Sequence, residues 1–218
     1  MKKVLCFGDS NTFGFIPEKC TRYDRNTRWT GVLQNLCKEH FKITEGGCNN
    51  RTAFIDNPAG IDQTGYKILP EYLKKEIYDI IILAIGINDL QLFFSPTLDE
   101  FEKGMSKLIE ITKTLSPTSK IILVCPSKLD LEGIKKGVFS FQFDEKSVEK
   151  SFRLPEIDKN LAEKHNCDFL DLNTVTEVSH LDGLHYSAEA HQKIANALFN
   201  FLQWWNEIVM FDISINFG

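Results

Sequence analysis

The stretch Val4-Leu5-Cys6-Phe7-Gly8-Asp9-Ser10-Asn11 begins as an apolar run and ends in polar turn residues. This pattern is typical of a buried strand that stops at a turn. In an open α/β sheet, ligands bind at the carboxyl ends of the strands, so a hydroxyl at this point faces a ligand rather than the core. Ser10 is therefore a candidate nucleophile, although Asp9-Ser10-Asn11 alone also fits a turn that caps the next element.

Four further apolar runs have the character of strands, and segments with helical spacing separate them. The run from Ile80 to Ile85 is continuously apolar, as a strand covered on both faces requires. Strands that alternate with helices form a parallel sheet with right-handed crossovers. We therefore predict a three-layer α/β/α sandwich whose five parallel strands have the flavodoxin-like order 2-1-3-4-5. The predicted strands are 3–7, 41–45, 77–85, 120–125 and 167–170, and the main predicted helices lie near 29–36, 97–115, 147–164 and 187–204.

Residues that break or cap helices refine this assignment. Pro155 is predicted to kink or split the helix near 147–164, and Ser187 is predicted to be the N-cap of the last helix. The stretch 131–143 is expected to be an irregular loop that could cover the crevice. Residues 1–205 are assigned to one domain and 206–218 to an apolar tail, packed on that domain or at an oligomer interface. Alternating apolar residues in this tail favour a short strand or a packed coil: Phe211, Ile213, Ile215 and Phe217.

Length and charge restrict the class of partner. The chain has 218 residues, 43% of them hydrophobic, and a formal net charge of -5. This charge argues against nucleic acid or an anionic membrane surface and favours a small neutral or mildly charged substrate. No secretory signal and no run of transmembrane length is visible, and the six cysteines are scattered singly. We expect reduced thiols, a cytoplasmic location and no membrane insertion.

A serine nucleophile needs a base to take its proton and a carboxylate to orient that base. Asp182-Gly183-Leu184-His185 supplies both, in a loop expected between the last strand and the last helix. The Asp182 carboxylate can accept from one ring nitrogen of His185 while the other nitrogen faces Ser10. Taken alone, the pair also fits an ordinary loop. Among the remaining histidines, His180 is the competing base, whereas three are expected to face solvent: His40, His165 and His191.

Two more loops lie at predicted strand ends. Gly86-Ile87-Asn88-Asp89 follows the central strand and offers the Asn88 amide, which could stabilise the oxyanion of an acyl-transfer intermediate. The loop 45–52, which follows the second strand, offers backbone N–H groups. Each loop alone could be an ordinary turn. The convergence of four loops at one edge of the sheet favours an active site.

These three blocks, in this order, resemble those of the SGNH hydrolases, also called GDSL-like lipases and esterases. The resemblance extends from Lys3 to about Leu202. It implies that Ser10 is the nucleophile, His185 the general base and Asp182 its orienting carboxylate. It also implies an oxyanion hole made of the Ser10 backbone N–H, a backbone N–H of the 45–52 loop and the Asn88 side chain.

The wider pattern is similar to the arylesterase and acyltransferase branch, in the stretches 10–14, 28–33 and 45–52. One departure concerns Asn50, which occupies the position where that family usually has glycine. Asn tolerates left-handed torsions, so its N–H can still be the second donor, with Gly47 as the alternative. Three neighbours in these loops are predicted to contact the substrate: Asn11, Gly47 and Asn49.

We therefore predict a serine esterase that hydrolyses small carboxylic esters, or transfers their acyl group, without a cofactor or a metal ion. Alternatives within the family are a carbohydrate O-deacetylase and a lysophospholipase or thioesterase. An alternative of another class is a catalytically silent α/β binding module. A homo-oligomer formed through the tail is a further hypothesis. Several side chains receive supporting roles: Asp9 and Asp89 accept loop N–H groups, Arg51 could pair with one of them, and Phe139, Phe141 and Phe143 line an acyl pocket or pack in the core.

Overall fold

The structure is a computed structural model that describes residues 1–17 and 19–215, with side chains described up to Gln203. Its centre is a parallel sheet with the strand order β2-β1-β3-β4-β5, which confirms the predicted order. The strands are β1 (Lys2–Gly8), β2 (Phe41–Gly47), β3 (Ile80–Ala84), β4 (Lys120–Cys125) and β5 (Asp168–Asp171).

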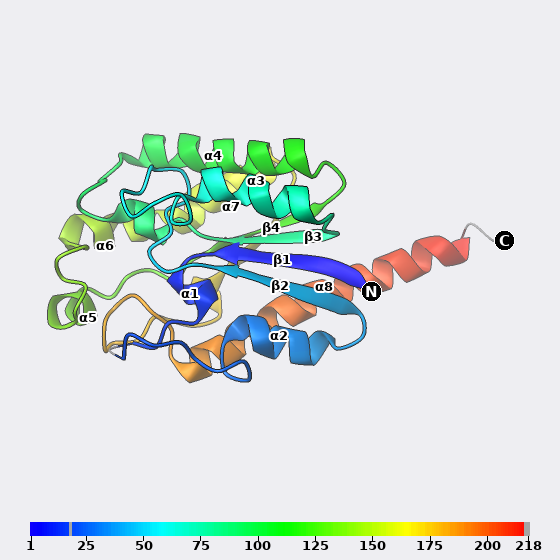
Figure 1. Cartoon of the computed structure of the whole chain (residues 1–218), viewed down its shortest axis with the longest axis horizontal. Coiled ribbons are helices and arrows are strands. Elements are labelled where there is room, and N and C mark those ends of the chain that lie inside the picture. The colour runs from blue at the N-terminus through cyan, green and yellow to red at the C-terminus, as the bar shows by residue number, and fades with distance from the viewer. Residues whose placement is uncertain (18, 216–218) are drawn as a thin grey trace.

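Helices cover both faces of the sheet (Figure 1), as the predicted three-layer sandwich requires. One face carries α3 (Gly65–Lys75), α4 (Leu98–Leu115) and α7 (Leu154–Lys164), and the other carries α2 (Trp29–Cys37) and α8 (Ala188–Ile215). Alternate residues of each strand point to opposite faces. Leu5 and Phe7 of β1 therefore belong to one hydrophobic cluster, and Val4 and Cys6 belong to the other.

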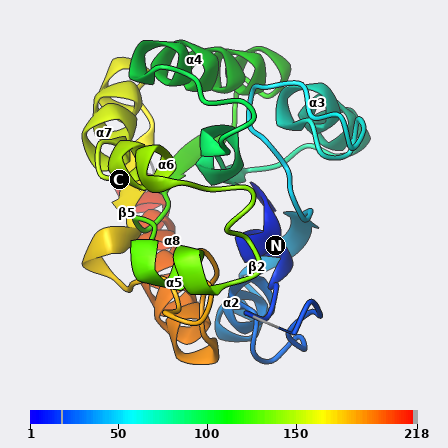
Figure 2. The same ribbon diagram turned by 90° about the vertical axis from the view of Figure 1, so that its left-hand side faces the viewer.

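The register of the strands brings three loops together at the carboxyl edge. Gly8 at the end of β1 pairs with Gly47 of β2 and with Ala84 of β3. The loops that follow these strands therefore begin side by side. Figure 2 looks onto this edge. The short elements found there are α1 (Ser10–Phe13), η1 (Ile87–Leu90), α5 (Leu131–Lys136), α6 (Glu145–Ser151) and η2 (Leu172–Thr174).

The predicted helix break and the predicted helix cap agree with the structure, whereas the predicted loop differs in part. The helix expected over 147–164 is split into α6 and α7, with Pro155 in the first turn of α7. Ser187 caps α8, because its Oγ accepts from the N–H of Ala190 at 3.2 Å. The expectation of an irregular loop over 131–143 is wrong for 131–136, which form α5. Asp130 caps this helix by accepting from the N–H groups of its first turn.

The C-terminal segment also differs from the prediction. Helix α8 continues to Ile215, so the strand expected from Phe211 onwards is wrong, and Phe217 lies outside the described residues. Figure 1 shows the C-terminal end of α8 extending past the sheet. The assignment of 206–218 as a separate tail, and its place in an oligomer, stay predictions.

All six cysteines are free thiols, in agreement with their scattered positions in the sequence. Three are buried, one is exposed and two lie between these extremes. Of the helices that the structure describes, none combines the length and apolarity needed to cross a membrane.

Asp158 of α7 is a carboxyl group buried in the core. Burial raises its pKa to about 7, because the nearby Cys125 thiol compensates little and Asp171 adds a repulsive charge. The folded protein therefore holds this proton more tightly than the unfolded chain, and its free energy of unfolding falls as pH rises from about 4 to 7.

Asp158→Asn removes this titration, so we expect the substitution to change the free energy of unfolding more favourably at pH 8 than at pH 5. The variant's free energy of unfolding relative to the parent should be higher at pH 8 by about 2 to 3 kcal/mol. Urea unfolding of both proteins at the two pH values measures this difference. An equal difference at both pH values would contradict it.

Candidate active site

Ser10 is the first residue of α1, directly after β1. Asp9 caps this short helix, since its carboxylate accepts from the N–H of Asn11 at 2.9 Å. Asn11 in turn donates through Nδ2 to the Leu184 carbonyl oxygen, which joins the Ser10 loop to the 182–185 loop. The loop that carries Ser10 is thus held at the carboxyl edge of the sheet by bonds of its two neighbours in sequence.

The structure brings the three predicted residues of the triad into one hydrogen-bonded chain. The Oγ of Ser10 lies 2.9 Å from Nε2 of His185, although 175 positions separate them. The Nδ1 of His185 lies 2.7 Å from Oδ2 of Asp182. All three side chains are buried, and Ser10 is 4% exposed. This order of groups can pass a proton from a serine hydroxyl to an imidazole backed by a carboxylate.

The 182–185 loop is folded around the Asp182 carboxylate. Its Oδ1 accepts from the N–H groups of Leu184 and His185, at 3.1 and 3.0 Å. Gly183 has φ +69°, and a Cβ there would come within 2.2 Å of the Asp130 carbonyl oxygen, so only glycine fits. Burial alone would raise the pKa of Asp182, but its hydrogen bond to His185 and the attraction between them lower it below the ordinary value. Asp182 is therefore an ionised partner for the imidazole.

Two aromatic rings cover the imidazole of His185. The ring centroids of Phe15 and Phe139 lie 4.3 and 5.0 Å from that of His185. Sequence reasoning had no signal for Phe15, and it left open whether Phe139 lines a pocket or packs in the core. The two other phenylalanines of that group differ from it, since Phe143 is buried in the core and Phe141 is 60% exposed.

Arg51 holds the loop after β2 against the end of β1. Its guanidinium donates to the carbonyl oxygens of Gly8, Gly46 and Asp62. No hydrogen bond or ion pair joins Arg51 to Asp9 or Asp89 among the described residues, so the expected pairing is wrong; Arg51 acts on Asp9 only through its charge. Asn50, the preceding residue, has φ +60°, the left-handed conformation that Asn tolerates.

Asn88 lies in η1, directly after β3, and joins its loop to the neighbouring one. Its Nδ2 donates to the Arg51 carbonyl oxygen at 3.0 Å. Within the described part of the chain, the second Nδ2 hydrogen of Asn88 has no partner. The same holds for the backbone N–H groups of Ser10 and Asn50. Three N–H donors from adjacent loops are thus available at one edge of the sheet.

Asp89 and Asp9 support these loops, as predicted. Asp89 accepts from three consecutive backbone N–H groups, those of residues 53–55. Burial raises the pKa of each carboxyl group to about 7, although these hydrogen bonds, and the charge of Arg51 beside Asp9, oppose the shift.

The comparison with known families agrees with this geometry. A family model described as the GDSL-like lipase/acylhydrolase family matches residues 6–193. The chain belongs to this family. It is an ester-hydrolysing serine hydrolase of the SGNH type, and the resemblance seen in the sequence is confirmed. No curated protein matches the chain closely enough to be counted as a relative.

Solved structures of esterases share the fold of this GDSL-like hydrolase over nearly its full length. The M. smegmatis aryl esterase is 27% identical with a TM-score of 0.86, covering 93% of this chain and 99% of its own. Est24, a carbohydrate acetylesterase from Sinorhizobium meliloti, is 29% identical with a TM-score of 0.85, covering 94% of this chain and 100% of its own.

The residues predicted to contact the substrate occupy different surroundings in this GDSL-like fold. Asn11 is buried and bonded to Leu184, and Asn49 is exposed. Gly47 lies against α1, where a Cβ would come within 2.2 Å of the Phe13 nitrogen. Their contacts with substrate stay predictions.

Among the described residues, His185 is the only histidine hydrogen-bonded to Ser10. His180 is exposed and paired with Asp130 at 2.8 Å. The expectation of a solvent-facing His191 is wrong: it is fully buried, accepts from the N–H of Trp29, and burial lowers its pKa to about 3. His165 is half-buried beside Ser106, and His40 is exposed. Among the described residues, no group of three or more His, Cys, Asp or Glu could hold a metal ion.

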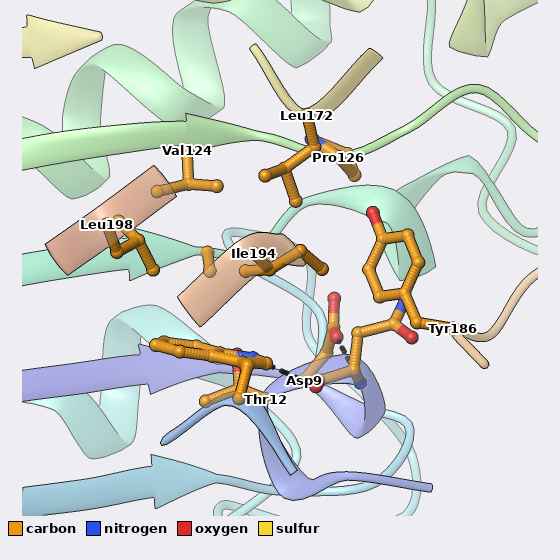
Figure 3. Close-up of a pocket in the computed structure, with 11 residues that line it drawn as sticks. Asp9, Thr12, Val124, Pro126, Leu172, Tyr186, Ile194 and Leu198 are labelled. Carbon is orange, nitrogen blue, oxygen red and sulfur yellow. Dashed lines mark hydrogen bonds between the residues drawn. The ribbon is translucent and has the colours of Figure 1, made fainter. Parts of the chain in front are cut away.

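A small cavity of about 20 Å³ lies behind the Ser10 loop, between the sheet and α8 (Figure 3). Its walls are mostly apolar, with Asp9 and Tyr186 at one end and Ile194 and Leu198 along the side. This volume suits about one water molecule and is far smaller than a ligand pocket. The cavity is therefore not a place for an ester.

Gln91 is a residue of the site that sequence reasoning missed. Its Nε2 lies 2.8 Å from Oδ1 of Asn50 and 3.0 Å from Oδ1 of Asn88. The available signal was its position three residues after Asn88, on the turn that follows the central strand.

Proposed function

We propose that this protein is a serine esterase that hydrolyses small carboxylic esters through an acyl-enzyme on Ser10. One observation carries the proposal: the aligned chain from Ser10 Oγ through His185 to the Asp182 carboxylate. In this assignment Ser10 is the nucleophile, His185 the general base and Asp182 the carboxylate that orients it.

The reaction then has two halves. His185 Nε2 takes the Ser10 proton as Oγ attacks the ester carbonyl, which gives a tetrahedral oxyanion, and the imidazolium returns the proton to the departing alkoxide. In the second half His185 takes a proton from water, the resulting hydroxide attacks the acyl group, and the proton returns to Ser10. An alcohol in place of water gives acyl transfer. The ionised Asp182 stabilises the imidazolium in both halves.

The oxyanion is assigned to three donors: the backbone N–H groups of Ser10 and Asn50 and the free Nδ2 hydrogen of Asn88. The loops that carry them begin beside one another, and the bond from Asn88 to the Arg51 carbonyl oxygen fixes two of them together. Donors held in place before the reaction stabilise the transition state without the cost of reorganisation.

Two findings support esters of short acids as the substrate class. The solved relatives are named an aryl esterase and a carbohydrate acetylesterase. Phe15 and Phe139 pack against the imidazole of His185, so two bulky rings border the site on that side. Deacetylation of carbohydrates is the second candidate, supported by the name of Est24.

The six free thiols support a reducing compartment such as the cytoplasm.

A hydrolysis screen tests this proposal. We expect kcat/KM for p-nitrophenyl acetate to exceed that for the octanoate by at least about 10-fold, since a mismatch in an apolar pocket costs 1 to 3 kcal/mol. Acetylated sugars in the same screen distinguish the second candidate, which predicts acetate release from them at a higher kcat/KM. A folded protein that hydrolyses none of these esters would instead favour a silent binding module.

A further inference from the structure

We propose that Gln91 is a positioning residue of the oxyanion site. In this role its side-chain amide holds Asn88 in the donor orientation and couples it to the Asn50 loop. The inference rests on the proposed function, because it concerns how two of the assigned donors are held. Gln91 is 2% exposed, and its Nε2 lies within hydrogen-bond distance of the Oδ1 atoms of both Asn50 and Asn88.

The orientation of the Asn88 amide follows from its neighbours. Its Oδ1 faces the Gln91 donor at 3.0 Å, and its Nδ2 faces the Arg51 carbonyl oxygen at 3.0 Å. A rotation of 180° about the last side-chain bond would place N–H against N–H on one side and oxygen against oxygen on the other. Gln91 and Arg51 together therefore select the orientation in which a second Nδ2 hydrogen remains available for an oxyanion.

The same Gln91 nitrogen fixes the side chain of Asn50. The φ of Asn50 is +60°, a conformation that costs a residue with a side chain more than it costs glycine. Its Oδ1 accepts from Gln91 at 2.8 Å, and its backbone oxygen accepts from Nδ2 of Asn57 at 2.7 Å. These bonds hold the side chain and the carbonyl group of Asn50, and so restrict the backbone of the residue whose N–H is the second assigned donor.

The location of Gln91 suits this role. It follows η1 directly, and its backbone N–H donates to the Asn88 carbonyl oxygen, so it holds Asn88 by main chain and side chain. Asn88 and Gln91 are both buried, so little water competes for the Asn88 oxygen, whereas Asn50 is half-buried. Removing Gln91 would leave the Asn88 oxygen without a strong donor and would weaken the preference for the productive amide orientation.

Two substitutions test the proposal. Gln91→Met keeps the length of the side chain and removes both donors; we expect kcat for p-nitrophenyl acetate to fall about 10-fold or more, with KM changing less than about 3-fold. Gln91→Glu places an acceptor against both oxygens and should turn the Asn88 amide around. Its loss in kcat should approach that of Asn88→Ala, about 10² to 10³. If Gln91→Met does not fold, the kcat of Gln91→Glu alone tests the proposal.

The matched control is Gln34→Met. The side chain of Gln34 of α2 also makes two hydrogen bonds: it donates to the Phe41 carbonyl oxygen and accepts from the N–H of Ile43. These bonds lie at the start of β2, at the opposite end of that strand from the site. We expect this variant to keep the kcat of the parent.

A double-mutant cycle separates positioning from a general loss of structure. If Gln91 acts through Asn88, adding Gln91→Met to Asn88→Ala should lower kcat by clearly less than the loss of about 10-fold expected in the parent, because only the bond to Asn50 is then left to lose. Losses that multiply, or a folded Gln91 variant with the kcat of the parent, would overturn the proposal. A protein that never hydrolyses an ester would instead overturn the proposed function, and the parent measured alone shows which has failed.

Discussion

Replacing Ser10 by Ala is expected to lower kcat for ester hydrolysis by about 10⁶-fold while the fold persists. The loss is this large because no other group can form the acyl-enzyme, and His185 without its partner has no proton to transfer. Ser10 makes no structural hydrogen bond through its side chain other than that to His185 within the described residues. The variant should therefore keep its circular dichroism spectrum. Its free energy of unfolding, measured in urea, should stay within about 1 kcal/mol of that of the parent.

Ser106→Ala is a matched control for this experiment. Ser106 of α4 also lies against a histidine, with Oγ 2.7 Å from Nε2 of His165, but it is remote from the carboxyl edge and from the three donors. We expect its kcat to equal that of the parent. If Ser10→Ala retained near-normal turnover, the assignment of the nucleophile would be wrong.

Asp182→Asn is expected to lower kcat by about 10⁴-fold with little change in geometry. The Asn oxygen can keep the backbone bonds from Leu184 and His185, so its NH₂ group must face Nδ1 of His185. Nδ1 must then accept, which places the imidazole proton on Nε2, facing Ser10. In this tautomer His185 cannot take the serine proton, and the positive charge of the imidazolium loses its partner.

Asp130→Asn provides the corresponding control. Asp130 pairs with His180 at 2.8 Å, but this pair is exposed and has no serine beyond it. Asn is also a good N-cap, so α5 should keep its cap. We expect kcat within about 2-fold of the parent. An equal loss in both variants would show that the Asp182 effect is not specific to the site.

The fold and the juxtaposition of Ser10, His185 and Asp182 could be predicted because both depend on patterns that are local in the sequence. Continuous apolar runs locate the strands, and in a parallel sheet all strands end at one edge. Ser10 and His185 are 175 positions apart, yet each lies in the first loop after a strand, which is enough to bring them together.

The errors have a different origin, since they concern side chains whose partners come from other elements. His191 reads as a surface residue, although its spacing of three, four and seven from Ile194, Ala195 and Leu198 places it on the buried face of α8. Arg51 reads as a partner for a carboxylate, but three carbonyl oxygens surround it once β1 and β2 are paired.

Gln91 could not be predicted for the same reason. Its two acceptors belong to loops 41 and 3 positions away, and only the packing of η1 against the loop after β2 makes them neighbours. The motif around Asn88 identifies a donor. How that donor is held is decided by residues outside the motif.

The most direct test of the central claim is to trap the acyl-enzyme. The parent protein is mixed with p-nitrophenyl acetate, quenched in acid within the first turnovers, digested and analysed by mass spectrometry. We predict one acetyl group on the peptide that contains Ser10, and none on that peptide in Ser10→Ala. An acetyl group on another residue, with Ser10 unmodified in an active protein, would contradict the account.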